Sequence, residues 1–420
     1  MRINRRFNAM ITVTIFLFIL WLLFYDDLLL SLWIGLLAVI SFSWVVSKTS
    51  LTSIDLNRFS SKKILEIGNI FDERLEIKNN SRLMKYWIEI IDRSELLEKI
   101  NSRVITGLGP KKVGIFQSTV VLNKRGFFSL GPTELISGDP FGLFTVSKTF
   151  NTKNHLLVYP KVNKLSRVPL LPADKAGSAF LMLQTTHTTP QAAGVREYTP
   201  GDPLSRVHWP ATIRHDKLMV KEFDEDSQSS IWIILDAQKE KYYRTVQEKT
   251  VPAFDRNFIS IKKTKEYFLP RDSFEYAVST AASLTKYFLA KNLSVGLACA
   301  GERLSVLPPE KGLRQLNKIL EGLATVKDVG KTPLEQLIEK QSKNISKGSA
   351  VILITAPRIE NHETFMETLR RKGFHVMKIV LDNASFIKDN EKSVGSNIDP
   401  SGSVIKILFG DDIGKVLSVN

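Results

Sequence analysis

The residues with the greatest capacity for chemistry lie close together in residues 194–223, called the charged segment below. It holds five Lys/Arg, four Asp/Glu, two His and one Trp within thirty residues. Each of its three arginines can make two parallel hydrogen bonds to a phosphate or a carboxylate. The charged segment therefore predicts a docking or anion-recognition surface. The candidate residues are Arg196, Glu197, Tyr198, Gly201, Asp202, Arg206, His208, Trp209, Arg214 and Lys221.

The same residues also allow a structural role, which stays open from the sequence. The arginines could pair with carboxylates of the segment, Trp209 could pack into a core, and residues 200–203 would form a turn in which Gly201 supplies a positive φ. The segment would then be a salt-bridged clasp between two domains. A third possibility is that His208 or His215 acts as a general base. No nucleophile motif accompanies them and the chain has no Gly-rich phosphate loop, so no catalytic residue is predicted.

Two polar side chains fall at the carboxyl ends of apolar runs. Asp236 directly follows Ile231–Leu235, and Thr355 ends Ala350–Thr355. In open α/β sheets, ligands bind outside the carboxyl ends of the strands. Asp236 and Thr355 are therefore candidate ligands at one edge of a sheet.

Residues 229–420 alternate between strand-like and helix-like patterns. Such alternation, with apolar strands, predicts a doubly wound and mostly parallel α/β sheet. Asp272 or Ser273 is expected to cap the first helix. The expected helices are Ser273–Ala290, 312–323, 334–341 and 363–372, and the expected strands are Ile231–Leu235, 293–300, Ala350–Thr355, His375–Leu381 and 404–408.

Residues 60–160 contain short runs of aromatic and β-branched residues without a long amphipathic helix. Strands at such spacing predict a small β-sandwich. The runs 113–122 and 126–135 flank turn residues at 123–126, so we expect them to pair as a hairpin. Residues 161–228 then form a connector that contains the charged segment.

Residues 1–50 contain two apolar runs, 7–24 and 28–46, separated by Tyr25, Asp26 and Asp27. Each run has about the 17–25 residues that a bilayer-spanning helix needs, so a transmembrane hairpin is predicted. Basic residues precede the first run and follow the second, and the tip has none. The positive-inside rule then puts both termini and the soluble domains in the cytoplasm, at the inner membrane.

The composition of the chain limits the classes of partner that it is expected to bind. The chain has 420 residues and a net charge of +15, which favours an anionic neighbour such as a membrane surface. The basic residues are dispersed and no RNA-binding motif occurs, so no nucleic acid partner is expected. The single cysteine, Cys299, lies in an apolar run and is expected to be a buried core residue.

Three blocks of sequence resemble a known family. They are residues 125–144, which contain Asp139-Pro140-Phe141-Gly142, residues 196–222, and the strand that ends before Asp236. In these blocks the chain resembles the bacterial "domain of unknown function 58" family, whose members pair a membrane hairpin with a von Willebrand factor A-like domain. The similarity spans nearly the whole chain.

The resemblance implies a Rossmann-like sheet of the kind that can hold a divalent cation such as Mg²⁺. In von Willebrand A domains, the motif Asp-x-Ser-x-Ser after the first strand holds the metal, together with a Thr and an Asp from other loops. Here that position reads Asp236-Ala237-Gln238-Lys239-Glu240, so both serines are missing and a lysine is nearby. Asp236 and Thr355 are thus the residues of a degenerate metal site, and no cofactor is expected.

The resemblance also implies action with a MoxR-type AAA+ ATPase in assembly or envelope maintenance. We therefore expect a membrane-anchored cytoplasmic adaptor or scaffold, not an enzyme. The alternative is a hydrolase or nucleotide-dependent enzyme that uses the carboxyl edge of the α/β sheet.

Overall fold

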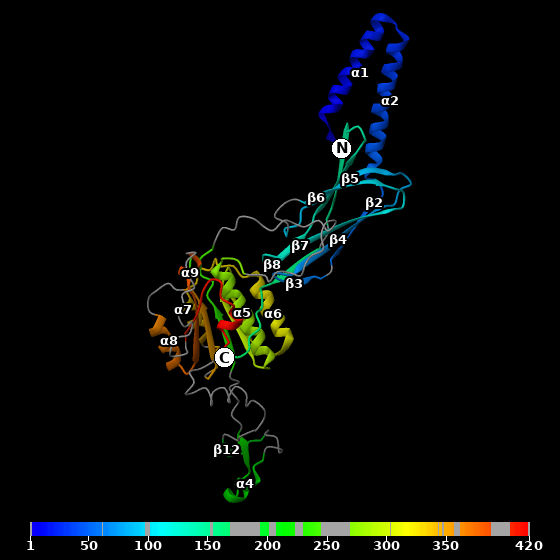
Figure 1. Ribbon diagram of the computed structural model, residues 1–420. Helices are drawn as coiled ribbons and strands as arrows, with labels where there is room; N and C mark the ends of the chain where they lie inside the picture. The colour runs from blue at the N-terminus through cyan, green and yellow to red at the C-terminus, as the bar shows by residue number, and fades with distance from the viewer. Residues whose placement is uncertain are drawn as a thin grey trace. The chain divides into compact units, whose positions relative to one another are not determined.

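The structure is a computed structural model, and its described residues fall into two compact units that divide between Tyr159 and Pro160 (Figure 1). The first unit holds two long helices and an all-strand part, the β-region. The second holds the elements of the charged segment and the α/β domain. The described residues are 2–60, 62–96, 101–151, 154–168, 194–200, 207–222, 230–244, 269–302, 304–342, 344–346, 348–356, 362–387 and 404–418.

Helices α1 (Arg5–Phe24) and α2 (Asp27–Ser50) form an antiparallel hairpin. Both have a mean hydropathy of 2.3 over their most apolar stretch, and both are long and apolar enough to cross a membrane. The chain reverses at Tyr25, which adopts a left-handed conformation with φ of 50°. The Asp26 carboxylate then caps α2 by accepting a 2.9 Å hydrogen bond from the backbone N–H of Leu28.

Both ends of this hairpin are fixed to the β-region. The residues before α1 form strand β1 (Arg2–Ile3), which pairs antiparallel with β10 (Phe144–Phe150). At the end of α2, the Thr49 carbonyl accepts a 2.5 Å hydrogen bond from Nζ of the buried Lys85. Burial lowers the pKa of Lys85. The two helix ends therefore lie on the same side, as the sequence predicts for a hairpin.

The β-region is a sandwich-like arrangement of mainly antiparallel strands. One sheet has the order β1-β10-β9-β5-β6, a second β2-β4-β7 and a third β3-β11-β8, in which β3 and β11 are parallel. Leu75, Ile77, Ile88, Ile90 and Leu135 form the core between the first two sheets. The remaining bounds are β2 Ile54–Ser60, β3 Ile64–Glu66, β4 Ile70–Asn79, β5 Lys85–Asp92, β6 Asn101–Leu108, β7 Val113–Val121, β8 Gly126–Leu130, β9 Thr133–Gly138 and β11 Asn154–Tyr159.

The hairpin predicted for residues 113–135 is wrong. Strand β7 pairs with β4, whereas β8 pairs with β11 in another sheet. The predicted second strand is broken at Gly131, which has a φ of 98°, and at Pro132, which has no N–H to donate to a ladder. The chain therefore changes sheet here, and β9 begins after the break.

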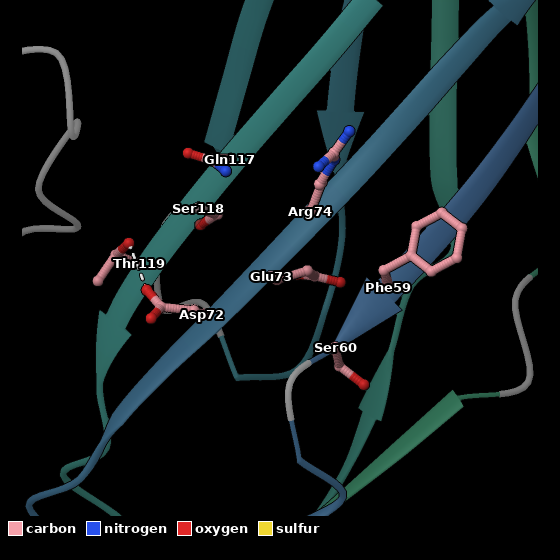
Figure 2. A pocket seen from close by; sticks show the side chains of 8 residues that line it. All are labelled: Phe59, Ser60, Asp72, Glu73, Arg74, Gln117, Ser118 and Thr119. Atoms are coloured by element: carbon pink, nitrogen blue, oxygen red, sulfur yellow. Dashed lines mark hydrogen bonds between the residues drawn. The ribbon is translucent and has the colours of Figure 1, made fainter.

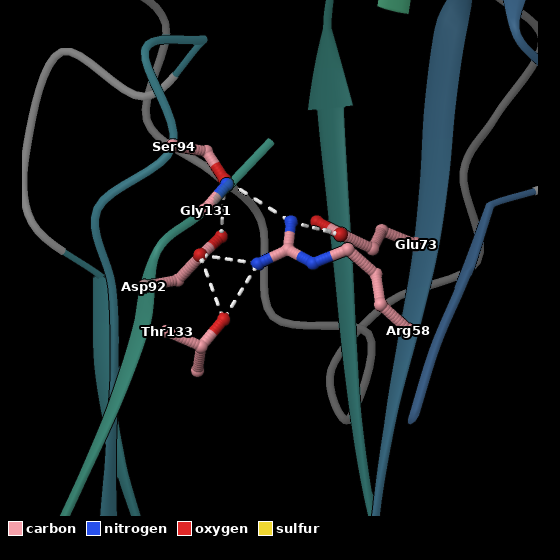
Figure 3. A network of polar contacts seen from close by, with 6 residues as sticks. All are labelled: Arg58, Glu73, Asp92, Ser94, Gly131 and Thr133. Carbon is pink, nitrogen blue, oxygen red and sulfur yellow. Dashed lines mark hydrogen bonds and ion pairs between the residues drawn. The ribbon is translucent and has the colours of Figure 1, made fainter. Parts of the chain in front are cut away.

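A buried ionic cluster joins the first two sheets of the β-region (Figure 3). Arg58 of β2 pairs with Glu73 of β4 and, at 2.5 Å, with Asp92 of β5 across the core. Arg58 also donates to the hydroxyls of Ser94 at 3.1 Å and of Thr133 at 2.7 Å. These five residues, the Arg58 cluster, give one buried cation two carboxylate partners. Burial, with the nearby Asp92 charge, raises the pKa of Glu73 to about 7, although Arg58 acts in the opposite direction.

The α/β domain contains a six-stranded sheet in the order β16-β15-β14-β17-β18-β19, parallel except for β16 against β15. Helices α7 and α8 pack on the face that carries Trp232 and Ile234, and α5 and α6 lie on the other face (Figure 1). The bounds are β14 Ile231–Leu235, α5 Ser273–Ala290, β15 Val295–Ala300, β16 Leu304–Glu310, α6 Gly312–Thr325, α7 Leu334–Ser342, β17 Ala350–Thr355, α8 His362–Arg371, β18 His375–Leu381, α9 Asn383–Ile387, β19 Val404–Ile407 and α10 Ile413–Val416.

This parallel-rich sheet covered on both faces is the architecture expected from the alternating pattern. Helix α5 has the predicted bounds, because the Asp272 carboxylate caps it by accepting 2.9 Å from the backbone N–H of Phe274. Strand β16 is missing from the prediction. Its Pro308 and Pro309 argue against a strand, but β16 lies at the edge of the sheet and its register with β15 shifts beside them, where proline is tolerated.

The Arg58 cluster generates a testable pH dependence. Because the pKa of Glu73 is higher in the folded protein than its ordinary value of 4.5, folding favours the protonated carboxyl. The stabilisation of the folded state by the protonated Glu73 carboxyl is complete below pH 4.5 and is lost as the pH rises to about 7. We expect Glu73→Gln to flatten the fall of the β-region's unfolding free energy over this interval, measured by chemical denaturation in detergent. Glu76→Gln, at a half-buried carboxylate of the same strand that lies outside the Arg58 cluster, should leave the slope as it is.

Candidate functional site

Asp236 lies directly after β14 and is buried, with its carboxylate fully engaged. Its Oδ2 accepts hydrogen bonds from the Lys241 ammonium and from the Thr355 hydroxyl, each at 2.8 Å. Its Oδ1 accepts from the backbone N–H of Gln238 at 3.1 Å. Asp236 and Thr355 are therefore brought together, as expected from their positions at the strand ends.

The sheet topology explains why Asp236 and Thr355 lie together. Strands β14 and β17 are parallel neighbours, and the chain leaves β14 for β15 on one side of the pair while β17 leads to β18 on the other. Their carboxyl ends thus meet where the strand order reverses, the place at which open α/β sheets bind ligands. The Asp236 backbone N–H donates 2.9 Å to the Ile354 carbonyl, which fixes the two ends against each other.

The loop after Asp236 places the lysine. Tyr242 is buried and its hydroxyl donates 2.6 Å to the Asp236 carbonyl, while the Lys241 carbonyl accepts 2.7 Å from Nδ2 of Asn383. Gly330 contacts the same loop so closely that a Cβ there would lie 2.8 Å from the Ala237 carbonyl oxygen. The ammonium on Asp236 therefore belongs to Lys241. Lys239, the lysine noted in the sequence, is exposed and pairs with Glu240.

These residues do not fit a divalent cation. A hard cation needs several free oxygen ligands, whereas both Asp236 oxygens already accept hydrogen bonds and one of them faces an ammonium. Among the described residues, no group of three or more His, Cys, Asp or Glu is placed to hold a metal. The Lys241 ammonium supplies the positive charge that a cation would bring.

Further charges near this edge also neutralise one another. Arg244 pairs with Asp272 at 3.1 Å and with Asp328. Burial and the nearby Glu275 raise the pKa of Asp272 to about 6, although Arg244 and two backbone N–H groups act in the opposite direction. The sequence reasoning missed Lys241, Arg244 and Asp328, because no motif marks them.

The described residues of the charged segment form a two-stranded sheet and a short helix. Strands β12 (Gly194–Glu197) and β13 (Met219–Glu222) pair antiparallel, and the short helix α4 (Trp209–His215) lies between them in the chain. His208 caps α4, since its Nδ1 accepts a 3.1 Å hydrogen bond from the backbone N–H of Ala211. Arg196 donates 2.8 Å to the Thr199 hydroxyl.

Within the described residues, Trp209 is not packed into a core. Its side chain is 63% exposed, and Ile213, one turn along the same helix, is 81% exposed. Glu197 pairs with Lys217 at 3.0 Å, and Arg214 lies in the last turn of α4. The backbone N–H of Tyr198 donates 2.8 Å to the Leu218 carbonyl. The candidates Gly201, Asp202 and Arg206 lie outside the described residues, as does the side chain of Lys221.

A second polar site is a hollow of about 240 Å³ on the β-region (Figure 2). It is lined by residues of β2, β4 and β7, and its carboxylates have protein partners. Asp72 accepts 2.8 Å from the Thr119 hydroxyl, and Glu73 pairs with Arg58. The lining residues are Phe59, Ser60, Asp72, Glu73, Arg74, Gln117, Ser118 and Thr119.

In a comparison with known families, one family model matches the charged segment and the residues that follow it. The family model "Protein of unknown function DUF58" matches residues 194–253. The resemblance to the DUF58 family is confirmed. YeaD of Bacillus subtilis strain 168, described as an uncharacterized protein, is 24% identical over 315 residues, which cover 73% of this chain and 69% of YeaD.

Solved structures add little to the resemblance to the DUF58 family. A CARDB domain from Pyrococcus furiosus is 8% identical, covers 25% of this chain and 91% of its own, and gives a TM-score of 0.19. The sporulation control protein Spo0M of Bacillus subtilis is 11% identical, covers 35% of this chain and 58% of its own, and gives a TM-score of 0.15. Such low scores support no inference about this chain.

The Asp236–Lys241 pair should dominate the stability of the α/β domain. Lys241→Met leaves a buried carboxylate unpaired, and we expect a loss of about 3–5 kcal/mol of unfolding free energy. Adding Asp236→Asn should recover most of that loss, because the remaining groups are neutral. Lys239→Met should change stability by less than about 0.5 kcal/mol. Chemical denaturation checks all three, and equal losses for Lys239→Met and Lys241→Met would contradict the assignment.

The His208 cap gives a second stability prediction. His208→Ala removes the acceptor for the Ala211 N–H, so α4 should open more easily by about 0.5–2 kcal/mol. His208→Asn keeps an acceptor and should lose much less. Hydrogen exchange of the α4 amides measures the difference, with His215→Ala at the other end of the helix as control. If His208→Asn opens α4 as much as His208→Ala, the capping role is wrong.

Proposed function

We propose that this chain is a membrane-anchored adaptor or scaffold whose second unit is a von Willebrand A-like domain. Numbered within the domain, the strand order is 3-2-1-4-5-6, a doubly wound order that supports a Rossmann-like sheet of this kind. Helices α1 and α2 supply the anchor. The basic residues that flank them support a cytoplasmic location for both termini and both units.

The proposal rests on the hydrogen bonds and the ion pair that occupy the Asp236 carboxylate. In an enzyme of this architecture, the strand-order reversal presents free groups to a substrate or cofactor. Here the carboxylate accepts hydrogen bonds from Lys241, Thr355 and Gln238, and an internal ammonium balances its charge. We infer that the site is structural, that no metal or other cofactor binds there, and that the chain acts by binding and not by catalysis.

The charged segment supplies the docking surface in this proposal. Trp209 and Ile213 project from α4, where they are largely exposed, and Arg214 adds positive charge in the last turn of the same helix. Aromatic and arginine side chains dominate binding energy at protein interfaces. The family resemblance makes a MoxR-type AAA+ ATPase the proposed partner, in assembly or envelope maintenance.

An enzymatic role at the carboxyl edge of the sheet is the competing function. It requires Asp236 to act on a substrate, so Asp236→Asn combined with Lys241→Met, which leaves no unpaired buried charge, would abolish the biological phenotype in the full chain while the fold survives. The adaptor proposal requires only that the domain stays folded. An unchanged phenotype with the double change therefore argues against the enzyme.

Binding of the detergent-solubilised full chain to a purified MoxR-type AAA+ ATPase of the same organism tests the adaptor. We expect binding in at least one nucleotide state, and a loss of about tenfold or more in affinity for Trp209→Ala with Ile213→Ala, as for interface hot spots. Phe127→Ala, at an exposed aromatic residue of β8, is the matched control. Absence of binding both with and without ATP would contradict the proposed partner.

A further inference from the structure

The turn between β9 and β10, residues 139–143, is held rigidly by one buried carboxylate. Asp139 accepts hydrogen bonds from the backbone N–H groups of Phe141 at 2.9 Å, Leu143 at 3.2 Å and Phe144 at 2.6 Å. The carboxylate therefore faces inward, and the apolar tip of the turn faces outward. Pro140 is exposed, and the Phe141 side chain is 50% exposed. We call residues 139–143 the Phe141 turn.

The Phe141 turn is attached to the start of α1. Asn4, the residue before the helix, donates from its backbone N–H to the Leu143 carbonyl at 3.1 Å and from Nδ2 to the Gly142 carbonyl at 2.9 Å. One turn along α1, the Phe7 ring contacts the Phe144 ring with centroids 4.9 Å apart. Figure 1 shows the β9–β10 hairpin reaching the base of the helix pair.

These contacts fix the level of the turn relative to the apolar part of the hairpin. The apolar run of α1 begins at Phe7, which lies beside the residue that follows the turn. If α1 and α2 cross a bilayer, Phe141 is held where the helices pass through the headgroup layer. Aromatic side chains favour this layer, where an apolar ring borders on water.

Positive charge surrounds the same place. Arg2, Arg5 and Arg6 are exposed, and the guanidinium of Arg6 lies so near Gly142 that an added Cβ would meet its Nη1 at 3.3 Å. The Asp139 carboxylate is buried and is occupied by the backbone N–H groups of the turn. An exposed aromatic tip beside exposed cations is complementary to an anionic lipid surface, which takes up the ring and pairs its phosphates with the guanidinium groups.

We propose that the Phe141 turn is a third membrane contact of this protein, in which Phe141 enters the headgroup layer of an anionic bilayer and Arg2, Arg5 and Arg6 bind lipid phosphates. The turn thereby fixes the tilt of the β-region against the membrane. This inference rests on the proposed membrane anchor formed by α1 and α2.

Cysteine-directed fluorescence tests it in the full chain. Cys299 is the single cysteine, so Cys299→Ala gives a background in which one introduced thiol is labelled with an environment-sensitive fluorophore. The positions are Phe141→Cys in the turn, Leu22→Cys in the apolar part of α1, and Phe127→Cys on β8 as an exposed aromatic control. Each protein is reconstituted into phosphatidylcholine vesicles with and without phosphatidylglycerol, and quenching by lipids spin-labelled near the headgroup or deep in the acyl chain is measured.

We expect headgroup-level quenching at position 141, deep quenching at position 22 and none at position 127. Quenching at position 141 should be several-fold stronger with phosphatidylglycerol and should weaken when Arg2, Arg5 and Arg6 are changed to Gln. If position 141 behaves like position 127 while position 22 is quenched, the turn proposal is wrong and the anchor stands. No quenching at position 22 overturns the anchor as well. Equal quenching at position 141 in both lipids overturns the anionic-lipid part.

Discussion

Asp236 lies at the carboxyl end of β14, a central strand of the α/β sheet, and its burial depends on the Lys241 ammonium. A lone carboxylate in that position would cost several kcal/mol of desolvation, and the ion pair with two further hydrogen bonds offsets it. The consequence reaches beyond the pair. The loop that carries Lys241 also holds Tyr242 against the Asp236 carbonyl and contacts Gly330, so the pair is tied to the packing of this loop.

In the β-region, too, a buried charge has partners of opposite sign. There the charge is a cation, Arg58, which lies between two carboxylates. The cluster connects strands of two different sheets, and the first of these sheets also holds the ends of the helix hairpin through β1 and through Lys85 of β5. Polar contacts thus link both ends of the hairpin to the β-region.

Local patterns predicted the elements whose determinants are local. Helix α5 has a capping aspartate at its start and an apolar repeat along its length, and the meeting of Asp236 with Thr355 follows from strand direction alone. Features decided by distant contacts were not predictable. The choice of Lys241 over Lys239 depends on how the loop packs, and the partner of β8 depends on the break at Gly131. The structure shows which described residues of the charged segment are exposed. The composition of the segment could not predict this.

Strand β16 closes one side of the six-stranded sheet, and its two prolines remove backbone donors from that margin. An unpaired strand margin invites the strands of other molecules, and chains concentrated in the plane of a bilayer meet far more often than chains in free solution. Without these two N–H groups, β16 is a poorer template for such pairing. Pro308 and Pro309 therefore lower the tendency of this sheet to pair edge to edge, at the cost of a weaker outermost strand.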